Sequence, residues 1–123
     1  MTFNSPKGRT GLARIVAAAN YSRDGLLAAF RGEAAFRQIV MLNAVLIPLA
    51  FFCPVSRGEL ALMIAVCLFS LIIELLNSAI EAVVDRISTE HHLLSKNAKD
   101  MGSAAQLIAL IMIAAVWGVI LLG

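Results

Sequence analysis

The chain alternates between long apolar runs and shorter polar segments, and this pattern predicts helices. Three runs are predominantly apolar, at residues 34–53, 60–85 and 103–122. A helix needs about 20 mostly apolar residues to cross a bilayer, and each run has at least about that length. The sequence therefore predicts an all-α membrane protein with three transmembrane helices, in a single domain that covers residues 1–123.

Residues 10–32 have a mixed pattern in which apolar positions recur at helical spacing beside Arg14 and Arg23. Such an arginine-bearing amphipathic helix can lie in the membrane interface with its apolar side toward lipid. An ordinary packed helix is the alternative, and the interface is favoured because so apolar a chain offers little soluble core. Gly25 is expected to bend or interrupt this helix. Residues 1–9 are predicted to be a loose tail.

Composition and charge agree with a membrane location. The chain is 60% hydrophobic and 15% charged, whereas soluble domains are usually about half apolar and about a quarter charged. The formal net charge of +2 is too small to suggest a nucleic-acid partner. Basic residues gather before residue 38 and in the polar loop at 86–100, whereas the loop between the first two spans offers only Arg57. The positive-inside rule then places the N-terminus and the 86–100 loop in the cytoplasm.

The second predicted span carries polar side chains near its cytoplasmic end, namely Glu74, Asn77, Ser78, Glu81 and Asp85. On a helical wheel these five positions fall within about 100° of one another. A charged group at mid-bilayer costs at least about 2.5 kcal/mol. We therefore expect this stripe to face a protein interior or a water-filled cleft.

Two interpretations of the stripe compete. A polar seam between helices explains an amide and a hydroxyl, but it explains three mutually repelling carboxylates poorly, so a functional site is favoured. Carboxylates near lysines and arginines suit Mg²⁺-assisted phosphoryl transfer. A cation or proton pathway would also use intramembrane acids, and it stays open at this point.

The nucleotide-binding motifs of soluble kinases are absent. The sequence has no GxxxxGK[ST] loop and no GxGxxG followed by a helix, so any nucleotide site must be built differently. His91 and His92 lack metal-ligand spacing and are interpreted as surface histidines when taken alone. Lys99 and Asp100 precede the third run, where Asp100 is an N-cap candidate as readily as a functional residue.

The segment from Glu74 to Arg86, ELLNSAIEAVVDR, resembles the signature of the prokaryotic integral-membrane diacylglycerol kinases. The blocks EAAFRQ at 33–38 and AKDMGSAA at 98–105 are also similar to that family, as are Arg14 and the Tyr-Ser pair at 21–22. The resemblance extends in order along essentially the whole chain.

The resemblance implies a homotrimer in the bacterial inner (cytoplasmic) membrane, with three spans and an interfacial N-terminal helix per subunit. The implied reaction is ATP-dependent phosphorylation of diacylglycerol to phosphatidic acid, with active sites between subunits at the cytoplasmic interface. Glu74 would be the general base and Asn77 would orient the site, while Glu33 and Glu81 would hold Mg²⁺.

The resemblance also implies two sets of binding residues. Those expected to contact ATP are Arg14, Tyr21, Glu33, Glu81, Glu90, His91, His92, Lys99 and Asp100. Those expected to contact the lipid substrate are Ala18, Ser22, Arg23, Ala35, Phe36, Arg37, Gln38, Phe52, Ser56, Glu74, Ser103 and Trp117.

The chain departs from the family pattern at three positions. Gly32 and Ile39 stand where the family has Asn and Glu, and Phe52 stands where Trp is common. A polar role at positions 32 or 39 is therefore not expected. A related branch, the undecaprenol kinases, shares the acidic signature. The long amphipathic N-terminal segment and the block at 99–103 are closer to the diacylglycerol branch, and undecaprenol stays open as the alternative acceptor.

Overall fold

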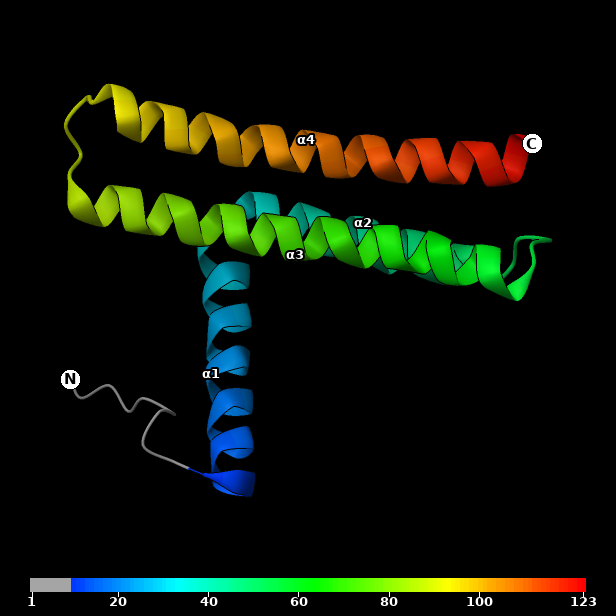
Figure 1. Cartoon of the computed structure of the whole chain (residues 1–123), viewed down its shortest axis with the longest axis horizontal. Helices are drawn as coiled ribbons and strands as arrows, with labels where there is room; N and C mark the ends of the chain where they lie inside the picture. Colours follow the sequence, from blue (N-terminus) through cyan, green and yellow to red (C-terminus); the bar gives the residue numbers. More distant parts are fainter. Residues whose placement is uncertain (1–9) are drawn as a thin grey trace.

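A computed structural model describes residues 10–123, so the predicted tail at 1–9 lies outside the described residues. Every regular element in the described part of the chain is a helix. The four helices, labelled in Figure 1, are α1 (Gly11–Gly32), α2 (Ala34–Ala50), α3 (Arg57–Ile87) and α4 (Leu93–Leu122). The predicted all-α class is confirmed.

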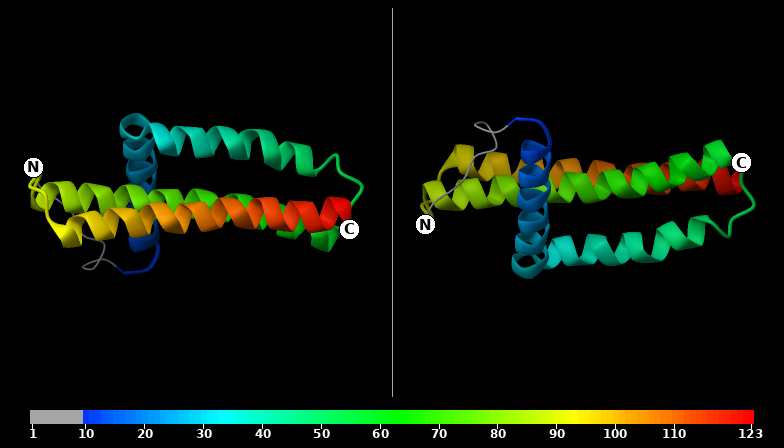
Figure 2. Two further views of the ribbon diagram at one scale, coloured as in Figure 1. Left: turned by 90° about the horizontal axis from the view of Figure 1, so that it is seen from above. Right: turned by 90° about the horizontal axis from the view of Figure 1, so that it is seen from below.

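Three of the helices form an elongated bundle, and the fourth projects from it. The central helix α3 packs against both α2 and α4, which lie along different sides of it (Figure 2). Helix α1 leaves the bundle steeply, because the chain turns by 106° between α1 and α2. The turn occurs at Glu33, whose backbone is extended, with φ −124° and ψ 111°. The acidic residue at this corner is thereby placed beside the bundle.

Two helices, α3 and α4, are long and apolar enough to cross a membrane. The bent pair α1 and α2 passes that test only when both helices are taken together. The chain is therefore a membrane protein with two to three candidate spans. Helix α3 has 31 residues, which gives a length of about 46 Å, while the hydrocarbon core is about 30 Å thick. One end of α3 must extend into the water-facing region.

Helix ends follow recognisable local chemistry. Before α3, the Ser56 hydroxyl accepts a hydrogen bond from the Glu59 backbone N–H at 3.2 Å, and the Glu59 carboxylate accepts one from the Ser56 backbone N–H at 2.9 Å. This reciprocal capping box fixes the start of α3. At the other corner, Arg37 donates from Nη1 to the carbonyl oxygens of Phe30, at 2.7 Å, and Arg31, at 3.2 Å. A cation on these last carbonyls stabilises the end of α1.

Three local features differ from expectation. Helix α1 is continuous through Gly25, because one glycine costs only about 1 kcal/mol in a helix. Helix α4 begins at Leu93, so only five residues, 88–92, separate it from α3. The interpretation of Asp100 as a helix N-cap is wrong, since His92 holds that position and accepts from the Leu94 backbone N–H at 3.1 Å.

The bundle core lies at the end away from α1. Met63 and Cys67 of α3 are fully buried, and Ala50 of α2 and Ile113 of α4 pack with them. Trp117 belongs to the same cluster, and its indole Nε1 donates to the Met63 carbonyl oxygen at 3.2 Å. This end of the bundle is therefore sealed by close packing.

Replacing Trp117 with alanine tests the importance of this core. The change leaves a cavity and removes the hydrogen bond to Met63, so we expect a loss of about 3 kcal/mol in the free energy of unfolding. Thermal loss of helix in detergent, followed by circular dichroism, measures it. Val119→Ala is the control, because the Val119 side chain is 74% exposed and its loss leaves no cavity. Equal melting temperatures for the two variants would contradict the assignment of the core.

Candidate functional site

The polar stripe of α3 is buried in its first half and opens to water in its second. Glu74 is 4% exposed, and Asn77 and Ser78 are also buried. Glu81 is half-buried and Asp85 is exposed. The stripe therefore runs from the packed interior of the bundle to its water-facing end.

Glu33 approaches this stripe from the corner between α1 and α2. With Ser78, Ala79 and Ala82 of α3, it lines an open hollow of about 290 Å³ whose other side is formed by α1. The α3 residues that line this hollow lie on the same turns as Glu74 and Glu81. The 106° turn therefore brings Glu33 beside a stretch of α3 that lies more than 40 positions away in the sequence.

The acids do not form a closed metal cage. Across residues 10–123, no three acidic, histidine or cysteine side chains lie close enough to hold one ion together. Mg²⁺ in phosphoryl-transfer sites is bound by one or two carboxylates together with substrate phosphates and water. Glu33 and Glu81 together carry the carboxylate oxygens that such a donor set needs.

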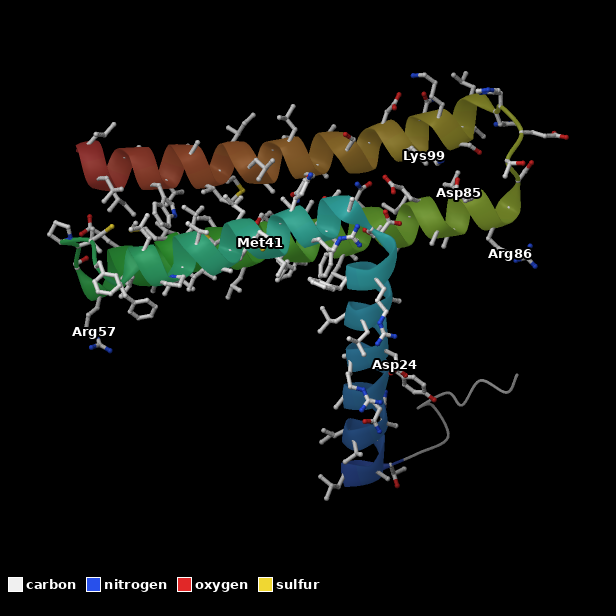
Figure 3. The ribbon with its side chains drawn as sticks, turned by 180° about the vertical axis from the view of Figure 1, so that it is seen from behind. Asp24, Met41, Arg57, Asp85, Arg86 and Lys99 are labelled. Carbon is white, nitrogen blue, oxygen red and sulfur yellow. The ribbon has the colours of Figure 1, made fainter. Side chains whose placement is uncertain are left out.

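A second hollow, of about 260 Å³, lies at the water-facing end between α3 and α4. Five of the residues expected to contact ATP line it: Glu90, His91, His92, Lys99 and Asp100. Two ion pairs flank it: Lys99 Nζ lies 2.7 Å from Asp85 Oδ1, and Lys96 Nζ lies 2.6 Å from Asp100 Oδ2. Figure 3 shows Asp85 and Lys99 on the facing sides of the two helices.

The expected site residues on α1 are not brought to this hollow within one chain. Arg14, Tyr21 and Arg23 are exposed on a helix that points away from the bundle (Figure 1). Ser22 donates to the Ala18 carbonyl oxygen at 2.9 Å within the helix. A single subunit therefore does not gather all the residues expected to contact ATP.

The residues expected to contact the lipid are spread along the whole bundle. Phe36 is 2% exposed, whereas Phe52 is 85% exposed at the opposite end of α2. Ser56 caps α3, about 27 Å along the helix from Glu74. Trp117 lies in the core rather than on an open surface. The others have mixed surroundings: Ala35, Gln38 and Ser103 are exposed, and Arg37 is half-buried against the end of α1.

Sequence reasoning missed polar residues that lie inside the bundle beside the stripe. Gln106 of α4 donates from Nε2 to the Ser70 carbonyl oxygen at 3.1 Å, and Asn43 of α2 donates from Nδ2 to the Ser70 hydroxyl at 3.4 Å. An available signal was the presence of an amide within the apolar stretches of the first and third runs, because such groups are costly unless they face another helix.

Gly102 was also missed as a contact residue. A Cβ atom at this position would collide with Asn77 Oδ1 and approach Asn77 Cγ to 3.1 Å. The absent side chain lets α4 approach the stripe closely.

A family model described as prokaryotic diacylglycerol kinase matches residues 20–121. The chain belongs to the prokaryotic diacylglycerol kinase family. It is 71% identical over 117 residues to a diacylglycerol kinase of Pseudomonas aeruginosa, with 95% of each chain covered. It is 51% identical over 114 residues to that of Escherichia coli K12, covering 91% of this chain and 92% of the relative. The resemblance inferred from the acidic signature is confirmed, and the protein is a kinase.

A pair of glycine substitutions tests the contact between α3 and α4. Gly102→Ala should lower the melting temperature in detergent, because the new methyl group displaces the buried Asn77 side chain. Gly118→Ala is the matched control on the same helix, since no atom lies within 4 Å of a Cβ placed there. That control should be neutral or gain up to about 1 kcal/mol from helix propensity. A Gly102→Ala variant as stable as Gly118→Ala would refute the close approach.

Proposed function

We propose that this kinase transfers the γ-phosphoryl group of ATP to the free hydroxyl of diacylglycerol, forming phosphatidic acid at the cytoplasmic face of the bacterial inner membrane. The observation that supports this most strongly is the position of Glu74. It is a buried carboxyl group on a candidate membrane span, and its stripe leads to a charged hollow at the water-facing end. A lipid hydroxyl reaches this site from the bilayer and a nucleotide reaches it from water.

In the proposed mechanism Glu74 acts as the general base. Its carboxylate takes the hydroxyl proton of the lipid as the hydroxyl oxygen forms a bond to the γ-phosphorus. The bond between that phosphorus and the β,γ-bridging oxygen breaks, and ADP leaves with the electron pair. Asn77, one turn further along α3, orients the acceptor. Phosphoryl transfer depends mainly on such positioning and on charge stabilisation.

Glu33 and Glu81 are the proposed Mg²⁺ ligands. Both acidic side chains are near Glu74 without closing a cage, as described above, which leaves room for phosphate oxygens in the coordination sphere. Mg²⁺ held by these two residues would supply charge neutralisation for the phosphates during transfer. Glu33 fixes one side of this site because the corner between α1 and α2 holds it in place.

The hollow between α3 and α4 is the proposed site for the nucleotide phosphates. Lys99 lies there with its ammonium group held by Asp85, and an ammonium group is a common point charge for phosphate. Arg14 and Tyr21 complete the ATP site from α1 of a neighbouring subunit. The projection of α1 away from its own bundle (Figure 1) supports this arrangement. We therefore propose a homotrimer with the N-terminus in the cytoplasm.

The competing proposal is a cation or proton conduit, and polar residues suited to it are found along only part of α3. Polar residues line the inner face of α3 from Asp85 down to Ser70. Beyond Ser70 the same face presents Cys67, Val66 and Met63, which are buried in the apolar core. A conduit needs polar groups across the full bilayer, so the described bundle supports a site with one opening.

Glu74→Gln is the central test of this mechanism. The substitution keeps the size of the side chain and removes the base, so we expect phosphatidic acid formation from Mg-ATP and diacylglycerol to fall by at least about 10²-fold. Glu59→Gln is the control, because it makes the same chemical change at the far end of α3, where glutamine also serves in a capping box. Undiminished turnover in folded Glu74→Gln would refute the role of Glu74.

Lys99→Met tests the proposed nucleotide site. Losing a charge-assisted contact to phosphate should raise KM for Mg-ATP by about tenfold or more, with KM for diacylglycerol little changed. Arg57→Met, which removes a cation at the opposite end of α3, should leave both constants as they are. An unchanged KM for Mg-ATP in Lys99→Met would contradict the placement of ATP between α3 and α4.

A further inference from the structure

Three polar side chains, which we call the amide cluster, meet in the interior of the bundle: Asn43 of α2, Ser70 of α3 and Gln106 of α4. Ser70 is fully buried, and both amides are less than 9% exposed. Each helix of the bundle contributes one member. In an apolar environment, hydrogen bonds between helices replace water as the partners of such groups.

The amide cluster is centred on one turn of α3. The Ser70 carbonyl oxygen accepts from Gln106 Nε2 at 3.1 Å, and the Ser70 hydroxyl accepts from Asn43 Nδ2 at 3.4 Å. In an α-helix the carbonyl of residue i accepts from the N–H of residue i+4, so the Ser70 carbonyl is also the partner of the Glu74 backbone N–H. Two neighbouring helices therefore hold the turn that carries the proposed base.

The hydrogen bonds of the amide cluster are incomplete. Asn43 Oδ1 and Gln106 Oε1 are buried and accept no hydrogen bond in the described part of the chain. Leaving a buried acceptor unpaired costs about 1–3 kcal/mol. Apolar residues of similar size would avoid that cost at both positions, so stability of the bundle alone does not account for the two amides.

We propose that Gln106, with Ser70 and Asn43, positions Glu74 for phosphoryl transfer. This inference rests on the proposed role of Glu74 as the general base. Gln106 fixes the turn that carries Glu74 relative to α4, both along the axis of α3 and in rotation about it. Helix α4 also carries Lys99 of the proposed nucleotide site. Misplacing a reacting group by about 1 Å can cost about 10²-fold in rate. Gln106 is a positioning residue in this account, because it acts through Glu74 and touches neither substrate.

Gln106→Met is the test, because methionine has nearly the same size and shape but cannot donate the hydrogen bond. We expect kcat to fall by about tenfold or more, with KM for Mg-ATP and for diacylglycerol changed by less than about twofold. The fold should survive, because hydrogen bonds between membrane helices average only about 0.6 kcal/mol. Leu107→Met is the matched control, since it places the same side chain at the next position, which is 60% exposed. Melting temperature in detergent is measured alongside turnover.

The inference is overturned if folded Gln106→Met turns over as fast as Leu107→Met, or if its KM values rise while kcat is unchanged. Asn43→Leu is the second variant, and it decides the question by the same criteria should Gln106→Met not fold. If neither variant folds, the amide cluster is a structural clamp and the inference is also overturned. Glu74→Gln in the same assay separates the two claims. An inactive Glu74→Gln beside a fully active Gln106→Met refutes only the positioning role, whereas an active Glu74→Gln refutes the proposed base.

Discussion

The cost of placing a carboxylate inside a membrane helix governs the arrangement of this protein. Glu74 is 4% exposed on a helix that is long and apolar enough to cross a membrane. Such a group must be sheltered from lipid. The bundle shelters it with α4, with the glutamine of the amide cluster, and with the corner between α1 and α2. Each of these features also adds a chemical group to the proposed site, so the contacts that shelter the acid are the ones that would assemble that site.

The division of the bundle into two ends follows from the same constraint. Beyond Ser70, the inner face of α3 is apolar and the core around Met63 and Trp117 is tightly packed. On the other side of Ser70, polar groups accumulate and the helices open into a charged hollow. One end of the bundle is closed by the packed core, and the other end has the hollow proposed for the nucleotide. For a kinase acting on a membrane lipid, this division gives both substrates access to one region without opening a path across the bilayer.

Much of the fold could be predicted from the sequence, because apolar runs and helical spacing are local signals. The stripe from Glu74 to Asp85 was visible on a helical wheel, and the family followed from its residues. Helix boundaries were less accurate. The start of α4 at Leu93 depends on a cap by His92, and polar residues on its first turns resemble a loop in the sequence. Contacts between distant segments could not be predicted either, because spacing along the chain gives no information on them. The meeting of Gly102 with Asn77 and that of Gln106 with Ser70 are examples.

The central claim is that the buried acid at the end of a polar stripe serves transfer of phosphate to a lipid hydroxyl. The most direct measurement offers diacylglycerol and undecaprenol side by side to the purified protein in a bilayer, with γ-labelled ATP and Mg²⁺. Our account predicts that the label appears in phosphatidic acid, that it depends on Mg²⁺, and that diacylglycerol is preferred. If the label appeared only in the polyprenol, the acceptor would be undecaprenol and not diacylglycerol. No label in either lipid, with the protein folded, would contradict it.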